Sequence, residues 1–209
     1  MRGLILGRGH SLKYYKEINT NDFDVVCLVN DFNMFVRQDD QLRNFLKDIS
    51  STAYLIQQVN ICCTSVDKYL LDNINIQEII STRLQSNGEN HWWREPTRAQ
   101  LCGRTLCRQP ESVESHMKYI ENSLGVAVAN MAVDRSCSEI TMIGSDFYET
   151  DYYLSHKEPD WDECSSIPTQ NRLKKGMDYL IGKFSNVNFT IYTCSTYTNS
   201  FENCKIIKI

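Results

Sequence analysis

Short segments of this chain are apolar at nearly every position rather than at alternate positions. Residues 2–6, 23–30 and 139–143 have this composition, and 23–30 reads FDVVCLVN. A strand with one face in water alternates polar and apolar residues, whereas a strand covered on both faces does not need to. The pattern therefore predicts a parallel sheet with helices on both sides. Further strand candidates lie in 52–63, 77–84 and 187–194.

Helix-like segments separate these strands along the chain. Apolar residues recur at helical spacing over 39–49 and again over 171–184. Residues 124–133 are apolar on all sides, which predicts a buried helix. With 209 residues, the chain is long enough for one sizeable domain. We therefore expect a single three-layer α/β/α domain over residues 1–209, with a mostly parallel sheet.

Residues 85–118 interrupt this alternation. The segment is polar, contains the pair Trp92-Trp93, and carries turn-forming residues at Gly88, Pro96, Gly103 and Pro110. This composition predicts an irregular excursion or lid that belongs to the domain. The two tryptophans would either stack on a ligand ring or anchor the excursion to the domain.

The charge and the hydropathy of the chain restrict its partners and its location. The formal net charge is −4, from 22 basic and 26 acidic side chains. Proteins that bind nucleic acid are usually basic, so we expect no nucleic-acid partner. No apolar stretch approaches the roughly 18 residues of a transmembrane helix, and the N-terminal apolar run is too short for a signal peptide. We expect a cytoplasmic protein without a transmembrane segment.

The chain has nine cysteines and no C-x-x-C pair. Scattered free thiols fit a reducing compartment, where they behave as small apolar side chains. Cys102 and Cys107, with His91 and His116 nearby, do not have the spacing of a standard zinc site. We expect neither a metal site nor a cofactor.

The first strand candidate runs directly into the turn Gly7-Arg8-Gly9-His10-Ser11. Ligands of parallel sheets bind outside the carboxyl ends of the strands, so this turn is a candidate site. Its glycines would let the backbone approach a ligand, and the amides at the start of the next helix favour an anion. Arg8 would add a positive charge, and Ser11 could cap the helix or donate to a phosphate. The alternative is an ordinary turn with an exposed arginine. The spacing matches neither the dinucleotide G-x-G-x-x-G motif nor a Walker motif.

Two other strand candidates also end in polar turns. Asn30-Asp31 follows the second strand, where asparagine could bond a ribose or a base, or simply form the turn. Residues 144–148 read GSDFY and are followed by Tyr152-Tyr153. Tyrosines offer phenolic donors to a phosphate and flat faces to a base, or they pack on the sheet.

Several of these segments resemble those of bacterial lipooligosaccharide sialyltransferases, which use CMP-sialic acid. Residues 7–12 are similar to the G-N-G-P-S-L turn of that family, and 23–30 to its F-D-V…N segment. Residues 125–148 parallel the family's apolar helix, strand and G-x-D-F-Y turn without a gap. Residues 171–194 continue in the same order, whereas 52–118 match poorly. The resemblance covers about half of the chain.

The resemblance implies a Rossmann-like domain that transfers a CMP-activated, sialic acid-like sugar to an acceptor hydroxyl without a metal. Its partners would be a nucleotide-sugar and a glycan or small-molecule acceptor, and it allows a homo-oligomer. The implied nucleotide contacts, with His10 on the same turn, are Gly7, Arg8, Gly9, Ser11, Asn30, Ser123, Gly125, Ser145, Asp146 and Phe147. Tyr148 would be one of two phosphate-binding tyrosines. The family's second position is Leu154 here, so Tyr152 or Tyr153 would take its place.

The chain departs from the family at functional positions. Arg8 stands where the family has asparagine, and could either bind the phosphate or occupy the pocket and exclude the nucleotide. The family's catalytic base, a histidine, matches Pro168, which cannot accept or donate a proton. We expect His156 to act as the base, with His10 and the acidic residues of 160–163 as alternatives. The expected catalytic residues are His156, Tyr148, Tyr152 and Arg8.

Two other functions stay open. The missing histidine favours a catalytically inactive relative that binds a nucleotide or acts through protein contacts. Asp31 and Asp146, at the ends of two strands, would favour a magnesium-dependent phosphoryl or pyrophosphoryl transferase.

Overall fold

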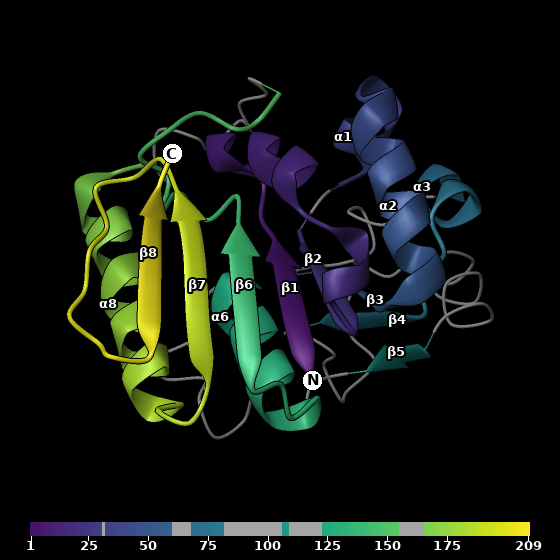
Figure 1. Cartoon of the computed structure of the whole chain (residues 1–209). Helices are drawn as coiled ribbons and strands as arrows, with labels where there is room; N and C mark the ends of the chain where they lie inside the picture. The colour runs from purple at the N-terminus through teal and green to yellow at the C-terminus, as the bar shows by residue number, and fades with distance from the viewer. Residues whose placement is uncertain (31, 60–67, 82–105, 109–122, 155–164) are drawn as a thin grey trace, which may run out of the picture.

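The computed structural model describes residues 1–30, 32–59, 68–81, 106–108, 123–154 and 165–209. Within them, eight strands form one sheet in the order β5-β4-β3-β2-β1-β6-β7-β8, and each neighbouring pair is parallel (Figure 1). The strands are β1 (Arg2–Leu6), β2 (Val25–Val29), β3 (Tyr54–Val59), β4 (Glu78–Ser81), β5 (Leu106–Arg108), β6 (Glu139–Ile143), β7 (Asn188–Thr193) and β8 (Cys204–Lys208). The expected parallel α/β sheet is confirmed.

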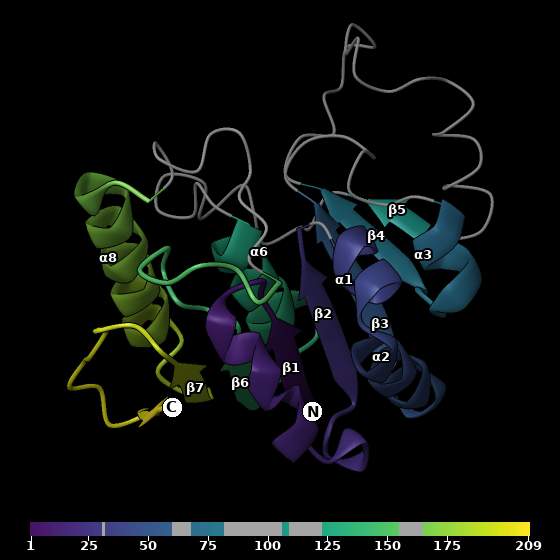
Figure 2. The same ribbon diagram turned by 90° about the horizontal axis from the view of Figure 1, so that it is seen from above.

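Helices lie on both faces of this sheet (Figures 1 and 2). One face carries α6 and α8, and the other carries η1, α1, α2 and α3 over the half of the sheet that contains β1 to β5. In Figure 1, no helix of the described chain covers the front of β7 and β8, so the expected second helical layer is incomplete there. The helices are η1 (His10–Glu17), η2 (Thr20–Asp22), α1 (Asn33–Gln38), α2 (Asp40–Thr52), α3 (Lys68–Asn73), α6 (Ser123–Ala129) with its π-helical continuation η4 (Asn130–Asp134), and α8 (Ile167–Lys183).

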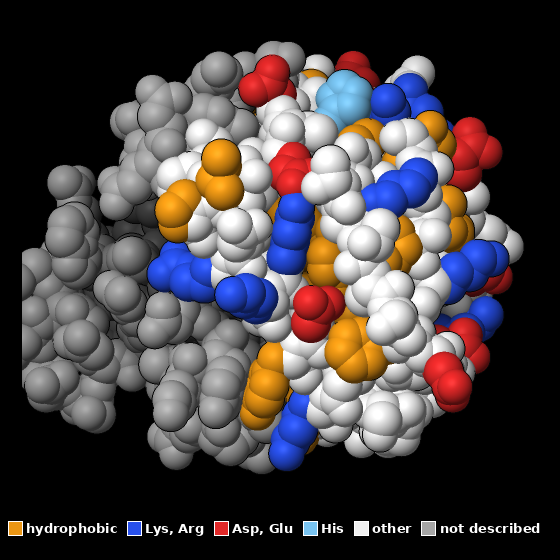
Figure 3. Space-filling model, turned by 90° about the vertical axis from the view of Figure 1, so that its left-hand side faces the viewer, with side chains coloured by type: hydrophobic (Ala, Val, Ile, Leu, Met, Phe, Trp, Pro, Cys, Tyr) orange, Lys and Arg blue, Asp and Glu red, His pale blue; other side chains and the backbone are white. Residues whose placement is uncertain are grey.

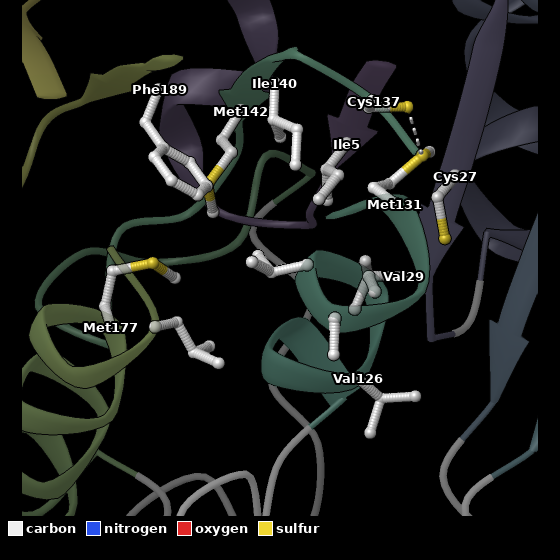
Figure 4. Packing of buried hydrophobic residues seen from close by; sticks show 14 of the residues in the cluster. Ile5, Cys27, Val29, Val126, Met131, Cys137, Ile140, Met142, Met177 and Phe189 are labelled. Atoms are coloured by element: carbon white, nitrogen blue, oxygen red, sulfur yellow. Dashed lines mark hydrogen bonds between the residues drawn. The ribbon is translucent and has the colours of Figure 1, made fainter. Parts of the chain in front are cut away.

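The core between the sheet and helices α6 and α8 is built from the apolar strand residues that the sequence pattern singled out. Ile5, Val29 and Met142 point from the strands toward Val126 of α6 and Met177 of α8, and all five are buried (Figure 4). Burial of this apolar surface is the main force that holds the layers together.

Cysteine side chains belong to the same core. Cys137 is buried beside Met131, and burial raises the pKa of its thiol to about 11 (Figure 4). The four cysteines among the described residues with side-chain data, Cys27, Cys137, Cys194 and Cys204, are free. Cys27 and Cys137 therefore act as buried apolar side chains, as expected.

The chain order creates a switch point in the sheet. The chain lays β1 to β5 side by side in one direction, and β6 then pairs with the opposite edge of β1. In open parallel sheets, ligands bind at the carboxyl ends of the two strands where the order reverses. A ligand site in this fold is therefore expected at the turns after β1 and β6.

The structure also differs in detail from the expected elements. The helical turns after β1 form the 3₁₀ helix η1, and β5 and β8 were not anticipated. β5 lies within the expected excursion 85–118, most of which falls outside the described residues. Across the described part of the chain, no helix combines the length and the apolar character needed to cross a membrane.

Candidate functional site

The turns after β1 and β6 cross each other at very short range. Gly7 N–H donates to Ile143 O at 2.7 Å, and Gly9 N–H donates to Gly144 O at 2.9 Å. A Cβ at Gly7 would lie 2.3 Å from Gly144 O, and one at Gly144 would lie 2.3 Å from Gly7 O. Gly144 also has a φ of +78°, which side chains rarely adopt. Glycine is therefore required at both positions, because the two backbones cross there without room for a side chain.

Asp146 joins three strand ends beneath this crossing. Its Oδ2 accepts from Ser11 N–H at 2.7 Å, and its Oδ1 accepts from Thr193 Oγ1 at 2.9 Å and Cys194 N–H at 2.8 Å. The side chain is almost completely buried. A Cβ at Gly9 would come within 2.5 Å of Oδ2, which explains the second glycine of the turn. The carboxylate thus fixes the turn after β1 to the ends of β6 and β7.

A cavity of about 130 Å³ opens at the carboxyl ends of β1 and β6. Its wall is formed by the two crossing turns, the end of β2 and the first residues of α6, with one residue of α8. The residues that line it are Gly7, Arg8, Gly9, Val29, Asn30, Ser123, Leu124, Gly144, Ser145, Asp146, Phe147, Tyr148, Thr150 and Leu173.

Backbone strain is concentrated at this cavity. Among the described residues, four other than glycine have a positive φ, and three of them line the cavity: Asn30 (65°), Phe147 (54°) and Tyr148 (60°). Each such conformation costs roughly 1–3 kcal/mol and is typical of functional sites. These backbone conformations direct the chain after β2 and the chain after β6 toward the same cavity.

Arg8 lies at the cavity wall against a tyrosine. Its Nη2 donates to Tyr152 Oη at 3.1 Å, and its Cζ lies 4.6 Å from the centroid of the Tyr152 ring. Tyr152 is buried and bridges to Gly9, while Tyr153 N–H donates to Arg8 O at 2.9 Å. The guanidinium is therefore held in place by a stacking contact and still borders the cavity.

The segment that carries the tyrosines crosses between η1 and α8 above the strand ends (Figure 2). Tyr148 lines the cavity, and its ring centroid is 6.3 Å from that of Tyr152. Gln170 of α8 donates to Tyr148 O at 3.2 Å. On the other side, Tyr153 Oη donates to Asp39 Oδ2 at 2.6 Å. These contacts hold the segment at both ends.

The Tyr153–Asp39 contact shifts the pKa values of both groups. Burial and the hydrogen bond to Asp39 raise the pKa of Tyr153. Burial alone would raise the pKa of Asp39, but the hydrogen bonds from Tyr153 and from the Leu42 and Gln41 amides lower it below its ordinary value. Asp39 also caps α2 through those two amides, so one carboxylate serves both the helix and the tyrosine.

Asn30 and Ser123 meet at the opposite wall of the cavity. Ser123 Oγ donates to Asn30 Oδ1 at 2.5 Å, and Gln57 Nε2 donates to Asn30 O. In the described part of the chain, Asn30 Nδ2 donates no hydrogen bond. Because Oδ1 is engaged, Nδ2 is the group of this amide that is left to make a further hydrogen bond.

The structure thus brings together most of the residues that the sequence predicted. Arg8, Asn30 and Tyr148 line one cavity, and the other predicted residues that do so are Gly7, Gly9, Ser123, Ser145, Asp146 and Phe147. Tyr152 lies behind Arg8. Of the residues that line the cavity, sequence reasoning did not single out Val29, Leu124, Gly144, Thr150 and Leu173 as contacts. Val29, Leu124 and Leu173 have the sequence pattern of ordinary core residues, so no sequence signal distinguishes them from the rest of the core.

Three predicted nucleotide contacts are not in the cavity wall. Ser11 is fully buried, and its Oγ accepts from Gly144 N–H at 2.9 Å, so it braces the crossing turns. His10 is exposed, with its Nε2 3.1 Å from Lys13 Nζ. Gly125 is buried inside α6.

The predicted base, and one of the two aspartates that would favour the alternative magnesium-dependent function, lie outside the described residues. His156 and Asp31 lie there. Pro168 is in the first turn of α8. In the portion that is described, no group of three or more His, Cys, Asp or Glu side chains is placed to hold a metal ion. Both oxygens of Asp146 already accept hydrogen bonds from the protein.

Comparison with solved structures identifies a similar fold. The chain superimposes on the crystal structure of the sialyltransferase CST-II in complex with a trisaccharide acceptor and CMP, with a TM-score of 0.54 and 18% sequence identity. The match covers 91% of this chain and 80% of CST-II. The resemblance drawn from the motifs is thereby confirmed at the level of the fold. No protein-family model and no curated protein sequence matches the chain.

Proposed function

We propose that the cavity at the β1–β6 switch point binds a CMP-activated, sialic acid-like sugar, and that the chain transfers this sugar to an acceptor hydroxyl without a metal. The observation that carries the proposal is the convergence of the glycine crossing, Arg8 and Asn30 on one cavity. The fold supports it, because CST-II, with which this chain shares that fold, was crystallised with CMP and an acceptor.

The residues have distinct roles in this proposal. Arg8 and the phenol of Tyr148 neutralise the charge that develops on the departing phosphate, with Tyr152 holding the guanidinium in position. The amides of the Gly7–Gly9 turn approach the nucleotide, and Asn30 Nδ2 donates to one of its acceptors. Tyrosine and arginine can donate hydrogen bonds to the departing phosphate and so stabilise its charge without a metal ion.

The transfer step needs a base for the acceptor. The acceptor oxygen forms a bond to the anomeric carbon, the bond from that carbon to the phosphate oxygen breaks, and its electron pair leaves with CMP. The hydroxyl proton passes to the base, for which His156 is our candidate and His10 the alternative. We also propose that the protein works in the cytoplasm, with residues 85–118 covering the acceptor side.

The described part of the face over α8 and β8 lacks the concentrated basic charge of a nucleic-acid site (Figure 3). On the face over α8 and β8, basic and acidic side chains alternate with neutral ones, and no large basic patch is visible (Figure 3). Nucleic-acid sites usually concentrate basic side chains on one face. A homo-oligomer stays compatible with the proposal.

The change in melting temperature on adding a nucleotide tests the binding part of this proposal. CMP should raise the melting temperature of the protein, and EDTA should leave that rise unchanged. Stabilisation by ATP with Mg²⁺ but not by CMP would favour a magnesium-dependent transferase instead.

A catalytically inactive nucleotide-binding relative is the second candidate. It is favoured by Pro168, which lies in the first turn of α8 at the position where the resembling family has its catalytic histidine. Incubation with CMP-sialic acid and a panel of acceptor sugars separates the two: release of CMP supports the transferase, and tight binding without release supports the inactive relative.

A further inference from the structure

A strained turn places Tyr148 in the cavity wall. Phe147 and Tyr148 follow one another with φ values of 54° and 60°, in the left-handed region that side chains rarely adopt. Such a conformation persists only where the surrounding contacts over-determine the backbone. The position of Tyr148 therefore depends on the contacts that hold the chain on either side of this turn.

The residue that follows the turn, Glu149, is anchored to two distant segments. Its Oε1 accepts from Lys174 Nζ of α8 and, at 2.8 Å, from Thr196 Oγ1, while its Oε2 accepts from Thr196 N–H. Lys174 Nζ also donates to Thr196 Oγ1 at 3.1 Å. The side chains of Lys174 and Glu149 are only 19% and 15% exposed, so solvent screens this ion pair weakly. We call Glu149, Lys174 and Thr196 the Glu149 clamp.

The segment that carries Thr196 is itself held by the last strand and by α8. Lys208 Nζ of β8 donates to Ser195 O at 2.6 Å and to Tyr197 O, on either side of Thr196. Tyr197 is buried, and its Oη donates to Asp178 Oδ1 of α8 at 2.6 Å. Glu149 is therefore tied to a segment that is fixed in place.

A second contact from α8 acts on the turn directly. Gln170 Nε2 donates to Tyr148 O at 3.2 Å and to Ser165 O at 2.8 Å. The backbone of Tyr148 is thus held at its carbonyl by Gln170, and through the next side chain by the Glu149 clamp. The three residues of the clamp are not among the described residues that line the cavity. The clamp therefore reaches the cavity through the backbone of the turn.

We infer that the Glu149 clamp positions Tyr148 for the reaction, because it holds the turn in its left-handed conformation and so fixes the phenol for the departing phosphate. This inference rests on the proposed function, which gives the phenol that role. A small displacement of a group that stabilises the transition state lowers the rate more than it weakens ground-state binding. The clamp joins residues 25 and 47 positions apart in the chain, so the geometry of the turn depends on the packing of α8 and of the segment after β7.

Amide hydrogen exchange without ligand tests the structural half of the inference. Lys174→Met removes the cation and keeps a long side chain. Exchange of Glu149 N–H, which donates to Asp146 O at 3.0 Å, and of Thr196 N–H should become about 10-fold faster. Leu12 N–H, which donates to Gly9 O in the turn after β1, should keep its rate, which shows that the change is local.

Two variants of α8 serve as controls for the exchange rates. Lys175→Met removes the next lysine of the same helix, which is exposed, and should leave all three rates unchanged. Lys174→Arg retains the charge and the donors and should restore most of the protection. Unchanged exchange of Glu149 N–H and Thr196 N–H in Lys174→Met would overturn the inference, whether or not the protein is a transferase.

Release of CMP from CMP-sialic acid tests the other half. Lys174→Met should lower kcat by about 10-fold, while the Kd for CMP changes by less than about 3-fold. Lys175→Met should keep the kcat of the unmodified protein, and Lys174→Arg should recover most of it. An equal loss in kcat and in CMP affinity would show that the clamp supports binding in general, and would overturn the inference.

A double variant decides whether the effect passes through the phenol. Adding Lys174→Met to Tyr148→Phe should lower kcat no further, because the group that the clamp positions is already absent. Losses that multiply would show that the clamp acts elsewhere, and would overturn the inference. Absence of turnover by the unmodified protein would contradict the proposed function and the catalytic half of the inference, whereas the exchange rates would still decide whether the clamp holds the turn.

Discussion

Gly7 and Gly144 lie so close together that a Cβ on either residue would stand 2.3 Å from the carbonyl oxygen of the other. This contact joins the ends of β1 and β6, between which the strand order of the sheet reverses. It places the turn with Arg8 and the turn with Asp146 beside one cavity. The candidate site thus depends on two residues that have no side chain.

Replacing Gly144 should therefore destabilise the protein strongly. In Gly144→Ala, the positive φ and the contact with Gly7 O should together lower the free energy of unfolding by at least about 3 kcal/mol. Gly182→Ala in α8 is the control, since its Cβ would meet only the partly exposed ring of Phe201, at 3.2 Å, which has to move by a few tenths of an ångström. It should change stability by less than about 1 kcal/mol. Equal effects of the two variants in urea unfolding would contradict the account of the crossing.

Asp146→Asn should also destabilise the fold, although the two side chains have nearly the same shape. Each carboxylate oxygen accepts from a backbone N–H, of Ser11 on one side and of Cys194 on the other. An asparagine must turn its NH₂ group toward one of these donors. We expect a loss of about 2–3 kcal/mol in unfolding free energy, whereas the exposed Asp151→Asn should cost little. A stable Asp146→Asn variant would show that the carboxylate does not hold the strand ends.

The Tyr153–Asp39 contact should make stability depend on pH at both extremes. Asp39 has a lowered pKa, so its contribution is complete above the ordinary value of about 4 and is lost as the pH falls through the lower folded value. Tyr153 has a raised pKa, so its contribution is complete below about 10 and is lost as the pH rises above that value.

Tyr153→Phe tests this contact directly. At neutral pH it should cost about 1 kcal/mol, a modest figure because both side chains are partly exposed to solvent. It should also flatten the loss of stability between pH 4 and more acidic solution that urea titrations measure. Tyr192→Phe, which removes a phenol of β7 that contacts no carboxylate in the described part of the chain, should leave the profile unchanged.

Arg8→Met should weaken the binding of CMP without weakening that of cytidine. The guanidinium is the cationic side chain in the cavity wall, and a charge-assisted contact to phosphate corresponds to about 10- to 100-fold in affinity. Arg37→Met is a close match, because Arg37 also stacks on a tyrosine, with its Cζ 4.4 Å from the Tyr69 ring centroid. It should bind both ligands normally. A stronger affinity for CMP in Arg8→Met would show instead that Arg8 blocks the cavity.

Tyr148→Phe should slow sugar transfer, or hydrolysis of the donor, much more than it weakens binding. The phenol is proposed to stabilise charge that develops only as the phosphate departs, so its loss should lower kcat by about 100-fold. The Kd for CMP should change by less than about 3-fold. An unchanged kcat would remove Tyr148 from the mechanism.

The parallel sheet and the location of the site were predictable from local patterns. Apolar strands and polar turns at their carboxyl ends are visible in 2–11 and 139–148, and the rule for parallel sheets brings these turns together. The strand β8 was not predictable in the same way, because its five residues, CKIIK, set two isoleucines between two lysines and lack the continuous apolar run of a buried strand.

Other features depend on contacts between distant parts of the chain. Ser11 looked like a phosphate donor, but its hydroxyl is used by Gly144, 133 residues away. The stacking of Arg8 on Tyr152 spans 144 residues. Leu124 and Leu173 line the cavity although their patterns are those of core helices. Local patterns identify candidate residues, and tertiary contacts decide which of them line the cavity.

A crystal structure of the chain with CMP would show whether the nucleotide occupies the cavity at the ends of β1 and β6. We expect CMP in the cavity between the Gly7–Gly9 turn and residues 144–148, with its phosphate beside Arg8. CMP bound elsewhere on the molecule, with Arg8 still on Tyr152 and the cavity without the nucleotide, would contradict it.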